Sequence, residues 1–174
     1  NFRTDFANEF ACIASATSDV KGACVYEEDY VRTCSFETQK ECNTRTSVNG
    51  TEFYPNKLCS SEDLGTNCGP TQKTTCIQEK DEVYFLDSCG NLANIYDANK
   101  INNKPYWDDV SIKAESCNAN GNNAGSKTCG NCDYYLGSTC GNYKRGVDNS
   151  QPTYGDDICK DLSCKYEGKT YQHG

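Results

Sequence analysis

The chain has 174 residues, of which 14 are Cys and only 25 are Leu, Ile, Val or Phe. So few aliphatic and Phe side chains exclude a large conventional hydrophobic core. A charged chain of this composition stays disordered unless covalent cross-links, such as disulfides, offset the conformational entropy lost on folding. The net charge of −8, with Lys and Arg scattered, excludes a concentrated basic face for nucleic acid and disfavours an anionic membrane surface.

The N-terminal segment, residues 1–18, differs in pattern from the rest of the chain. Its apolar side chains recur at helical spacing, and they are Phe2, Phe6, Phe10 and Ile13. The spacing predicts a short helix capped by Thr4 or Asp5. The same Phe residues share strand parity with Cys12, so an extended arm with one apolar face is the alternative. These four apolar residues are the candidates for self-association with neighbouring copies, and folding back onto their own module is the other option.

Residues 19–70 are predicted to form a first Cys-rich β module. Two apolar pairs, at 25–26 and 30–31, flank an acidic turn at 27–29. The strongest hairpin signal lies over residues 44–54, where Asn49-Gly50 suits a type I′ turn between β-branched and aromatic flanks. Ser60 or Ser61 is expected to cap one helical turn over 60–64.

Residues 71–174 are predicted to form a second Cys-rich β module, after a Gly- and Pro-containing boundary at 69–75. A hairpin over 76–89 has the apolar run 83–86 as its return strand, and another over 164–171 turns at Glu167-Gly168. Residues 118–128 contain few apolar side chains and are expected to form an exposed loop. The fold class expected is therefore small, disulfide-rich and mainly β, with hairpins, short sheets, long loops and little helix beyond the N-terminal segment.

The cysteines indicate an oxidising compartment, and their even number predicts that all are oxidised. Each part of the chain could close its own bridges, although spacing alone does not fix the connectivity. Cys129 and Cys132 lie too close in sequence for an unstrained bridge between them, so we expect each to pair elsewhere rather than to bind zinc or act as a redox pair. The predicted disulfide cysteines are Cys12, Cys24, Cys34, Cys42, Cys59, Cys68, Cys76, Cys89, Cys117, Cys129, Cys132, Cys140, Cys159 and Cys164.

Catalytic chemistry has little support in the sequence. The only imidazole, His173, stands next to the last residue, so no Ser–His or Cys–His arrangement is expected. The chain is therefore expected not to be an enzyme and to have no catalytic residues, and its paired carboxylates are interpreted as surface charge. No metal site is assigned, and calcium is the one candidate ion, because it accepts loop oxygens such as those at 97–102, 148–149 and 156–157.

Two features point to carbohydrate. Asn49-Gly50-Thr51 is a sequon for N-glycosylation at an expected turn, so Asn49 is the candidate glycan acceptor. Four aromatic side chains could stack on sugar rings or could instead form a core, and they are Tyr106, Trp107, Tyr134 and Tyr135.

Three stretches carry a resemblance: residues 84–91 with 94–97, residues 129–140, and residues 155–164. They resemble modules of very large, Cys-rich, uncharacterised surface proteins of DPANN archaea, and the likeness covers mainly residues 76–174. The resemblance implies a cell-surface or extracellular setting and a chain that is one piece of a longer product. It assigns no functional residues.

The function expected from these observations is a secreted structural or adhesive glycoprotein, such as a subunit of an extracellular filament or cell-surface coat. Its expected partners are neighbouring copies of itself and a glycan, without nucleic acid and without insertion into a membrane. The alternative is a carbohydrate-binding, lectin-like extracellular module. A second alternative is a secreted inhibitor or toxin-like binder.

Overall fold

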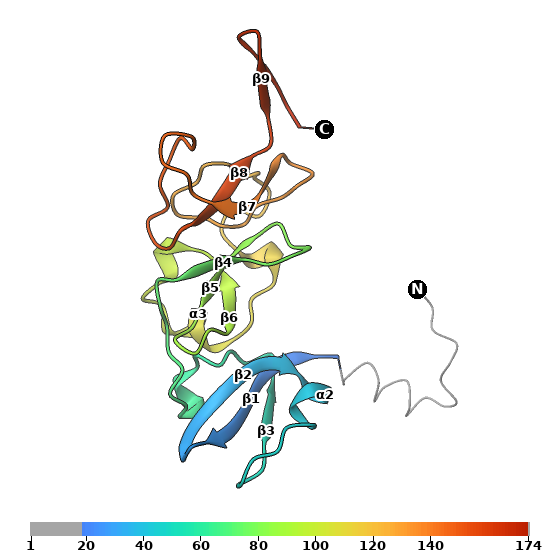
Figure 1. The fold of residues 1–174 in the computed structure, drawn as a ribbon, viewed down its shortest axis with the longest axis vertical. Helices are drawn as coiled ribbons and strands as arrows, with labels where there is room; N and C mark the ends of the chain where they lie inside the picture. The colour runs from blue at the N-terminus through green and yellow to red at the C-terminus, as the bar shows by residue number, and fades with distance from the viewer. Residues whose placement is uncertain (1–18, 174) are drawn as a thin grey trace, which may run out of the picture.

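The computed structural model describes residues 19–173, so residues 1–18 and 174 lie outside the described part of the chain. The predicted N-terminal helix or arm therefore lies outside it as well. The described chain is elongated, and four small antiparallel sheets follow one another along its long axis (Figure 1). Over residues 19–173, no helix is long and apolar enough to cross a membrane. The expected fold class, mainly β with only short helices, is confirmed.

The elements are short throughout. The strands are β1 (Lys21–Glu28), β2 (Val31–Thr38), β3 (Glu52–Pro55), β4 (Thr74–Cys76), β5 (Val83–Leu86), β6 (Leu92–Ile95), β7 (Ser138–Asn142), β8 (Asp157–Asp161), β9 (Cys164–Tyr166) and β10 (Lys169–Tyr171). The helical elements are α2 (Gln39–Cys42), α3 (Lys104–Asp108) and the 3-10 turns η1 (Glu62–Leu64), η2 (Ala98–Lys100) and η3 (Lys113–Glu115).

The first sheet has β1 at its centre, with β2 and β3 on either side. A Cβ at Gly22 would lie 2.2 Å from the carbonyl oxygen of Tyr54, so glycine permits the close approach of β3. The turn between β1 and β2 consists of Asp29 and Tyr30, whose φ angles of 50° and 64° are those of a type I′ hairpin. The turn is therefore at 29–30 and not at the predicted 27–29: only Asp29 of the acidic triplet belongs to it, and the two glutamates belong to β1.

The predicted hairpin over residues 44–54 is wrong. A turn does form, because the N–H of Gly50 donates to the carbonyl of Ser47 at 3.1 Å, but residues 44–47 form no strand. Instead the N–H groups of Thr44 and Arg45 bond back to carbonyls of α2, which has a Thr38 capping box. β3 consequently pairs with β1 rather than with the segment before the turn.

The second sheet, β4-β5-β6, contains the aromatic core. The return strand at 83–86 of the predicted hairpin is confirmed, but its first strand is β4 at 74–76, so the hairpin begins two residues before the predicted range of 76–89. Residues 91–116 form β6, η2, α3 and η3. Phe85 of β5 is fully buried, and its ring centroid lies 5.0 Å from that of Tyr96 and 5.1 Å from that of Trp107 on α3. Aromatic rings thus fill the space that aliphatic side chains occupy in most cores.

The C-terminal end contains the ribbons β7-β8 and β9-β10. The predicted hairpin over 164–171 is confirmed, and Glu167 and Gly168 adopt φ angles of 47° and 76° at its turn. Residues 118–128 form a loop as expected, but Asn123 is buried there. Its amide group donates to the carbonyl of Asn131 at 2.7 Å, which fixes the loop to the body.

The sequence boundary at 69–75 is crossed by covalent and packing contacts. Cys68 and Cys89 form a disulfide across it, so the two parts do not each close their own bridges. Leu58 belongs to the same buried cluster as Phe85, and Phe36 packs against that cluster. Besides the backbone, the Cys68–Cys89 disulfide and shared apolar contacts therefore attach the first part of the chain to the second.

Candidate binding surfaces

Disulfides determine which cysteines remain available for other chemistry. The six bridges are Cys24–Cys42, Cys34–Cys59, Cys68–Cys89, Cys76–Cys140, Cys117–Cys129 and Cys132–Cys159. Cys164 is unpaired and exposed, so the prediction that every cysteine is bridged does not hold for Cys164 within one chain. Cys12 lies outside the described residues. Six bridges in so small a chain are typical of an oxidising environment.

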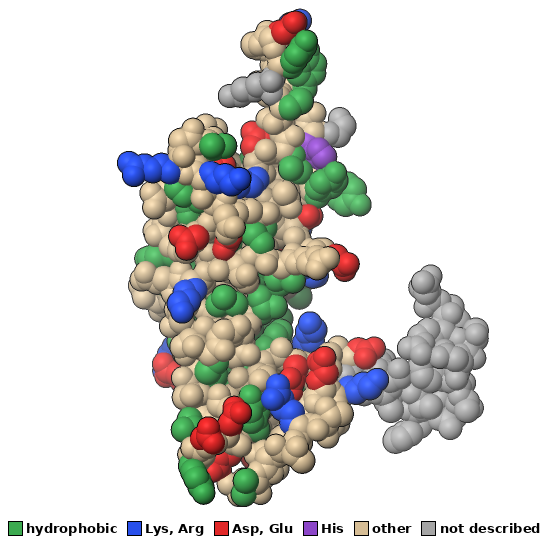
Figure 2. Space-filling view, viewed as in Figure 1, with side chains coloured by type: hydrophobic (Ala, Val, Ile, Leu, Met, Phe, Trp, Pro, Cys, Tyr) green, Lys and Arg blue, Asp and Glu red, His purple; other side chains and the backbone are tan. Residues whose placement is uncertain are grey.

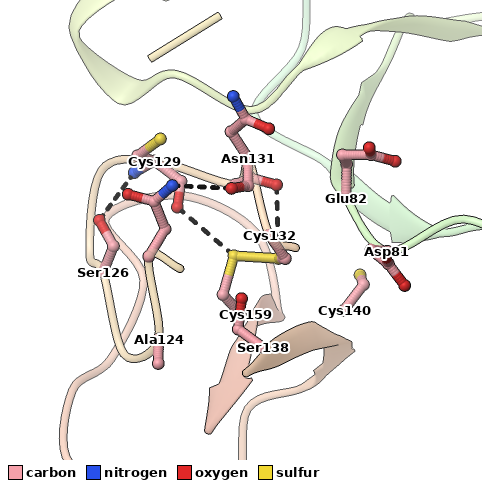
Figure 3. Close-up of a disulfide and its surroundings, with 12 residues drawn as sticks. Asp81, Glu82, Ala124, Ser126, Cys129, Asn131, Cys132, Ser138, Cys140 and Cys159 are labelled. Atoms are coloured by element: carbon pink, nitrogen blue, oxygen red, sulfur yellow. Dashed lines mark hydrogen bonds between the residues drawn. A yellow bond between two sulfur atoms is a disulfide. The ribbon is translucent and has the colours of Figure 1, made fainter. Parts of the chain in front are cut away.

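The closely spaced cysteines Cys129 and Cys132 bond to two different partners, as predicted: Cys129 to Cys117, and Cys132 to Cys159, the disulfide drawn in Figure 3. The backbone N–H of Cys129 donates to the hydroxyl of Ser126 at 3.1 Å, and Cys132 is fully buried against Cys159. Within the described residues, the two clusters of three metal-ligand types each contain two bridged cysteines. Bridged sulfur is not a thiolate, so neither cluster offers a zinc site.

The candidate calcium carboxylates accept hydrogen bonds within the fold. Asp97 accepts from the backbone of η2, and Asp157 accepts from the hydroxyl of Thr74 at 2.9 Å. Asp148 forms an ion pair with Lys160. Burial alone would raise the pKa of Asp148, but hydrogen bonds from Lys160 and from the backbone of Lys144 outweigh it and lower that pKa. These oxygens therefore already contribute to holding loops in place.

An ion pair between a buried carboxylate and a partly exposed ammonium ties the loop after α3 to the second sheet. Glu82 is 6% exposed, and its carboxylate lies 2.7 Å from the ammonium of Lys113, which also donates to the carbonyl of Cys132 at 3.0 Å. Burial would raise the pKa of Glu82, but bonds from Lys113, its own backbone N–H and the Tyr84 hydroxyl together lower it. The charges are paired within the fold, so we assign this cluster a structural role.

The aromatic residues considered for sugar binding divide into two groups. Tyr106 and Trp107 are buried in the core, where the indole N–H of Trp107 donates to the carbonyl of Ile101 at 3.0 Å. Tyr134 and Tyr135 are exposed, and their rings meet edge to face at 6.0 Å. His173 is half-buried, and its ring centroid lies 4.4 Å from that of Tyr134. Only the second pair is therefore accessible to a ligand.

The glycosylation sequon lies on the exposed turn at 47–50. Asn49 is exposed, and its side-chain amide donates to the carboxylate of Glu27 on β1. A glycan attached to this nitrogen leaves one N–H, so the contact with Glu27 can persist. The position is sterically open to a modifying enzyme in a secretory compartment.

Most of the large, well-exposed apolar side chains lie toward the two ends of the described chain, and smaller areas of apolar surface also occur along the body between them (Figure 2). At the end formed by the first sheet, which we call the β1–β2 end, the exposed residues are Tyr30, Val31 and Val48. At the C-terminal end they are Tyr134, Tyr135, Leu136, Val147, Tyr166 and Tyr171. Between the ends only Val110 and Ile112 are comparably exposed among residues 19–173. The sequence did not reveal this distribution, because it depends on where the turns place each side chain.

Comparisons of the chain with protein-family models, curated proteins and solved structures find no match. The fold and its bridges define a disulfide-stapled β protein, and its function is argued from its own surfaces.

Proposed function

We propose that the protein is a secreted structural glycoprotein that assembles end to end into an extracellular filament or cell-surface coat. The observation that carries the proposal is the placement of exposed apolar side chains at the two ends of an elongated chain. Tyr30 and Val48 are 97% and 95% exposed at one end, and Tyr135 is 89% exposed at the other. Apolar surface gathered in this way marks interaction sites.

The geometry favours a polymer over a closed dimer. The two ends differ in sequence and in shape, so contact between the β1–β2 end and the C-terminal end is heterologous. Two copies joined by a heterologous contact still have one free β1–β2 end and one free C-terminal end. Further copies can therefore add, and they form a filament when the rotation between successive copies does not close a ring. Because six disulfides hold the body of each copy together, its two ends keep a fixed relative orientation, and each contact repeats the same rotation between copies.

Substitutions at the β1–β2 end should weaken assembly. Tyr30→Asn with Val48→Thr removes two apolar groups, and Asn tolerates the positive φ of position 30. Burying each such side chain contributes about 1.5–3 kcal/mol, so the double variant should raise the critical concentration for assembly at least about tenfold. Sedimentation and electron microscopy measure this. Ile112→Thr, which changes an exposed side chain between the ends, is the matched control.

A glycan at Asn49 is the basis for calling the protein a glycoprotein. Thr51→Ala should remove the glycan and lower the intact mass of the secreted protein, whereas Thr51→Ser should keep both, because Ser also completes the sequon. Mass spectrometry of the intact protein and of its peptides measures the difference. An identical mass for the two variants, apart from the substituted side chains, would contradict the assignment.

Sugar binding is a second candidate function, favoured by the exposed pair Tyr134 and Tyr135 beside His173. Tyr rings stack on the apolar faces of sugars, and the neighbouring carboxylate of Asp133 can accept hydrogen bonds from hydroxyls. A monomeric protein retained on a glycan array, and released by Tyr135→Ala, would favour this function over assembly.

A further inference from the structure

A small groove on the first sheet begins at the candidate glycan acceptor. We call it the Asn49 groove, and its lining includes Val25, Glu27, Arg32, Asn49, Gly50 and Glu52. Its volume is about 170 Å³. Pockets for drug-sized ligands have volumes of about 300–1,000 Å³, so the Asn49 groove suits a single small ring rather than a longer ligand.

The strand register places the charged side chains of the groove on one face of the first sheet. Glu27 of β1 is opposite Arg32 of β2, and Val25 of β1 is opposite Glu52 of β3. Opposite residues in an antiparallel pair share a face, and so do residues two apart on one strand. Because Val25 is buried, three charged side chains surround an apolar floor.

These charged groups keep hydrogen-bonding capacity that the fold does not use. The guanidinium of Arg32 lies 2.8 Å from the carboxylate of Glu52, and its Nε–H donates to the carbonyl of Leu64 at 2.9 Å. Among the described residues, these bonds occupy two of its five N–H groups. The carboxylates of Glu27 and Glu52 each have one oxygen that accepts no bond from the described residues. The groove therefore offers both donors and acceptors to a ligand.

The turn at 47–50 is fastened to β1, which fixes the position of the acceptor nitrogen. The hydroxyl of Ser47 accepts from the N–H of Glu27 and donates to the carbonyl of the same residue, each at 3.1 Å. The side-chain amide of Asn49 donates to the carboxylate of Glu27, which lines the groove. A Cβ at Gly50 would have no atom within 4 Å, so the approach from the turn is open.

We propose that the first sugar of a glycan on Asn49 lies in the Asn49 groove. A pyranose ring has an apolar face, which fits the floor at Val25. Its hydroxyl groups both donate and accept, so they can bond to the carboxylates of Glu27 and Glu52 and to the remaining N–H groups of the arginine. The ligand class is a hexose or N-acetylhexosamine joined to the Asn49 nitrogen. The inference rests on the glycan of the proposed function and specifies where that glycan lies.

A sugar held in the groove leaves the assembly surface uncovered. Tyr30 and Val48 are exposed at the β1–β2 end, and neither is among the lining residues of the groove. A glycan that moved freely about Asn49 would cover the neighbouring Val48 for part of the time. The proposed position therefore makes a glycan at this end compatible with end-to-end contact.

A double-mutant cycle between the glycan and the groove tests the proposal on the full chain. Wild type and Glu52→Ala are each secreted by a glycosylating host, with and without an inhibitor of N-glycosylation, so both forms of each protein have the same sequence. The glycan should lower the equilibrium constant for unfolding at least about tenfold in wild type, because the sugar gains hydrogen bonds to charged groups. In Glu52→Ala it should change that constant less than about twofold.

Denaturant titration under non-reducing conditions measures all four proteins, and the cycle cancels the effect of the substitution on folding itself. Glu37→Ala is the matched control, because Glu37 also pairs with an arginine, Arg45, but lies on the opposite face of the first sheet. The glycan should stabilise Glu37→Ala as much as it stabilises wild type. An equal effect of the glycan in wild type and in Glu52→Ala would overturn the inference.

Nuclear magnetic relaxation of the sugars tests the same position without any substitution. A first sugar held in the groove moves with the protein, so the order parameter of its anomeric C–H bond should be about 0.85, the value of a rigid backbone. The outer sugars should have values below about 0.6. A first sugar as mobile as the outer ones would overturn the inference.

The outcomes separate this inference from the proposed function. If Asn49 of the secreted protein were unmodified, both the groove position and the glycan of the proposed function would be overturned. If Asn49 were glycosylated but its first sugar were mobile, only the groove position would be overturned. End-to-end assembly would stand in either case if Tyr30→Asn with Val48→Thr still weakened it.

Discussion

Full reduction of the six disulfides is expected to unfold the protein at room temperature, so that heating the reduced protein shows no cooperative unfolding transition. The bridges span 12 to 64 residues, and loops of such lengths contribute about 3–4 kcal/mol each by restricting the unfolded chain. Six of them contribute about 20 kcal/mol, less some overlap between nested loops. That exceeds the net stability of about 5–15 kcal/mol of ordinary domains, so the reduced chain should unfold.

Near-UV dichroism followed during heating, with and without reductant at neutral pH, measures this effect. Cys164→Ser without reductant is the control, because it removes a thiol that forms no bridge within the chain and should leave the transition unchanged. A cooperative transition that survives complete reduction and alkylation would show that the apolar core suffices.

Phe85→Ala is expected to lower the free energy of unfolding by about 3–5 kcal/mol with all bridges intact, the usual cost of deleting a buried aromatic ring. Phe85 is fully buried and contacts the rings of Tyr96, Tyr106 and Trp107, so its removal opens a cavity among groups that repack poorly.

Denaturant titration under non-reducing conditions measures the change. Tyr135→Ala, which truncates an aromatic ring that is 89% exposed, should change the free energy of unfolding by no more than about 0.5 kcal/mol. If Phe85→Ala lowered the free energy of unfolding by less than about 1 kcal/mol, the disulfides alone would be sufficient to stabilise the second sheet.

Local turn chemistry made part of the fold predictable. Glu167-Gly168 and the apolar run 83–86 identified their hairpins correctly, because each signal lies within the element that it forms. The Asn49-Gly50 signal was misleading, because the strand after it pairs with β1, whose backbone groups on that edge would otherwise lack partners. That choice depends on contacts between residues distant in sequence, which a local pattern does not contain.

The candidate surfaces were less predictable than the fold. Asn49 could be identified from its sequon. The four aromatic residues looked alike in the sequence, and only the structure shows that Tyr134 and Tyr135 are exposed whereas Tyr106 and Trp107 are buried. The unpaired state of Cys164 required knowledge of the other bridges, because 14 cysteines allow many pairings. The assembly candidates Phe2, Phe6, Phe10 and Ile13 lie outside the described residues.

The order of the bridges has a mechanical consequence for a chain under tension. The shortest covalent path from Cys24 to Cys159 passes through Cys34–Cys59, Cys76–Cys140 and Cys132–Cys159, and follows the backbone for only about 35 residues. At about 3.4 Å per residue, and with 5.3–5.5 Å between the Cα atoms of each bridge, this path extends to about 135 Å, whereas the whole backbone between those cysteines would extend to about 450 Å. Pulling on the two ends therefore reaches a covalent limit at about three tenths of the contour length. A thread of such units would resist breaking even after its sheets have unfolded.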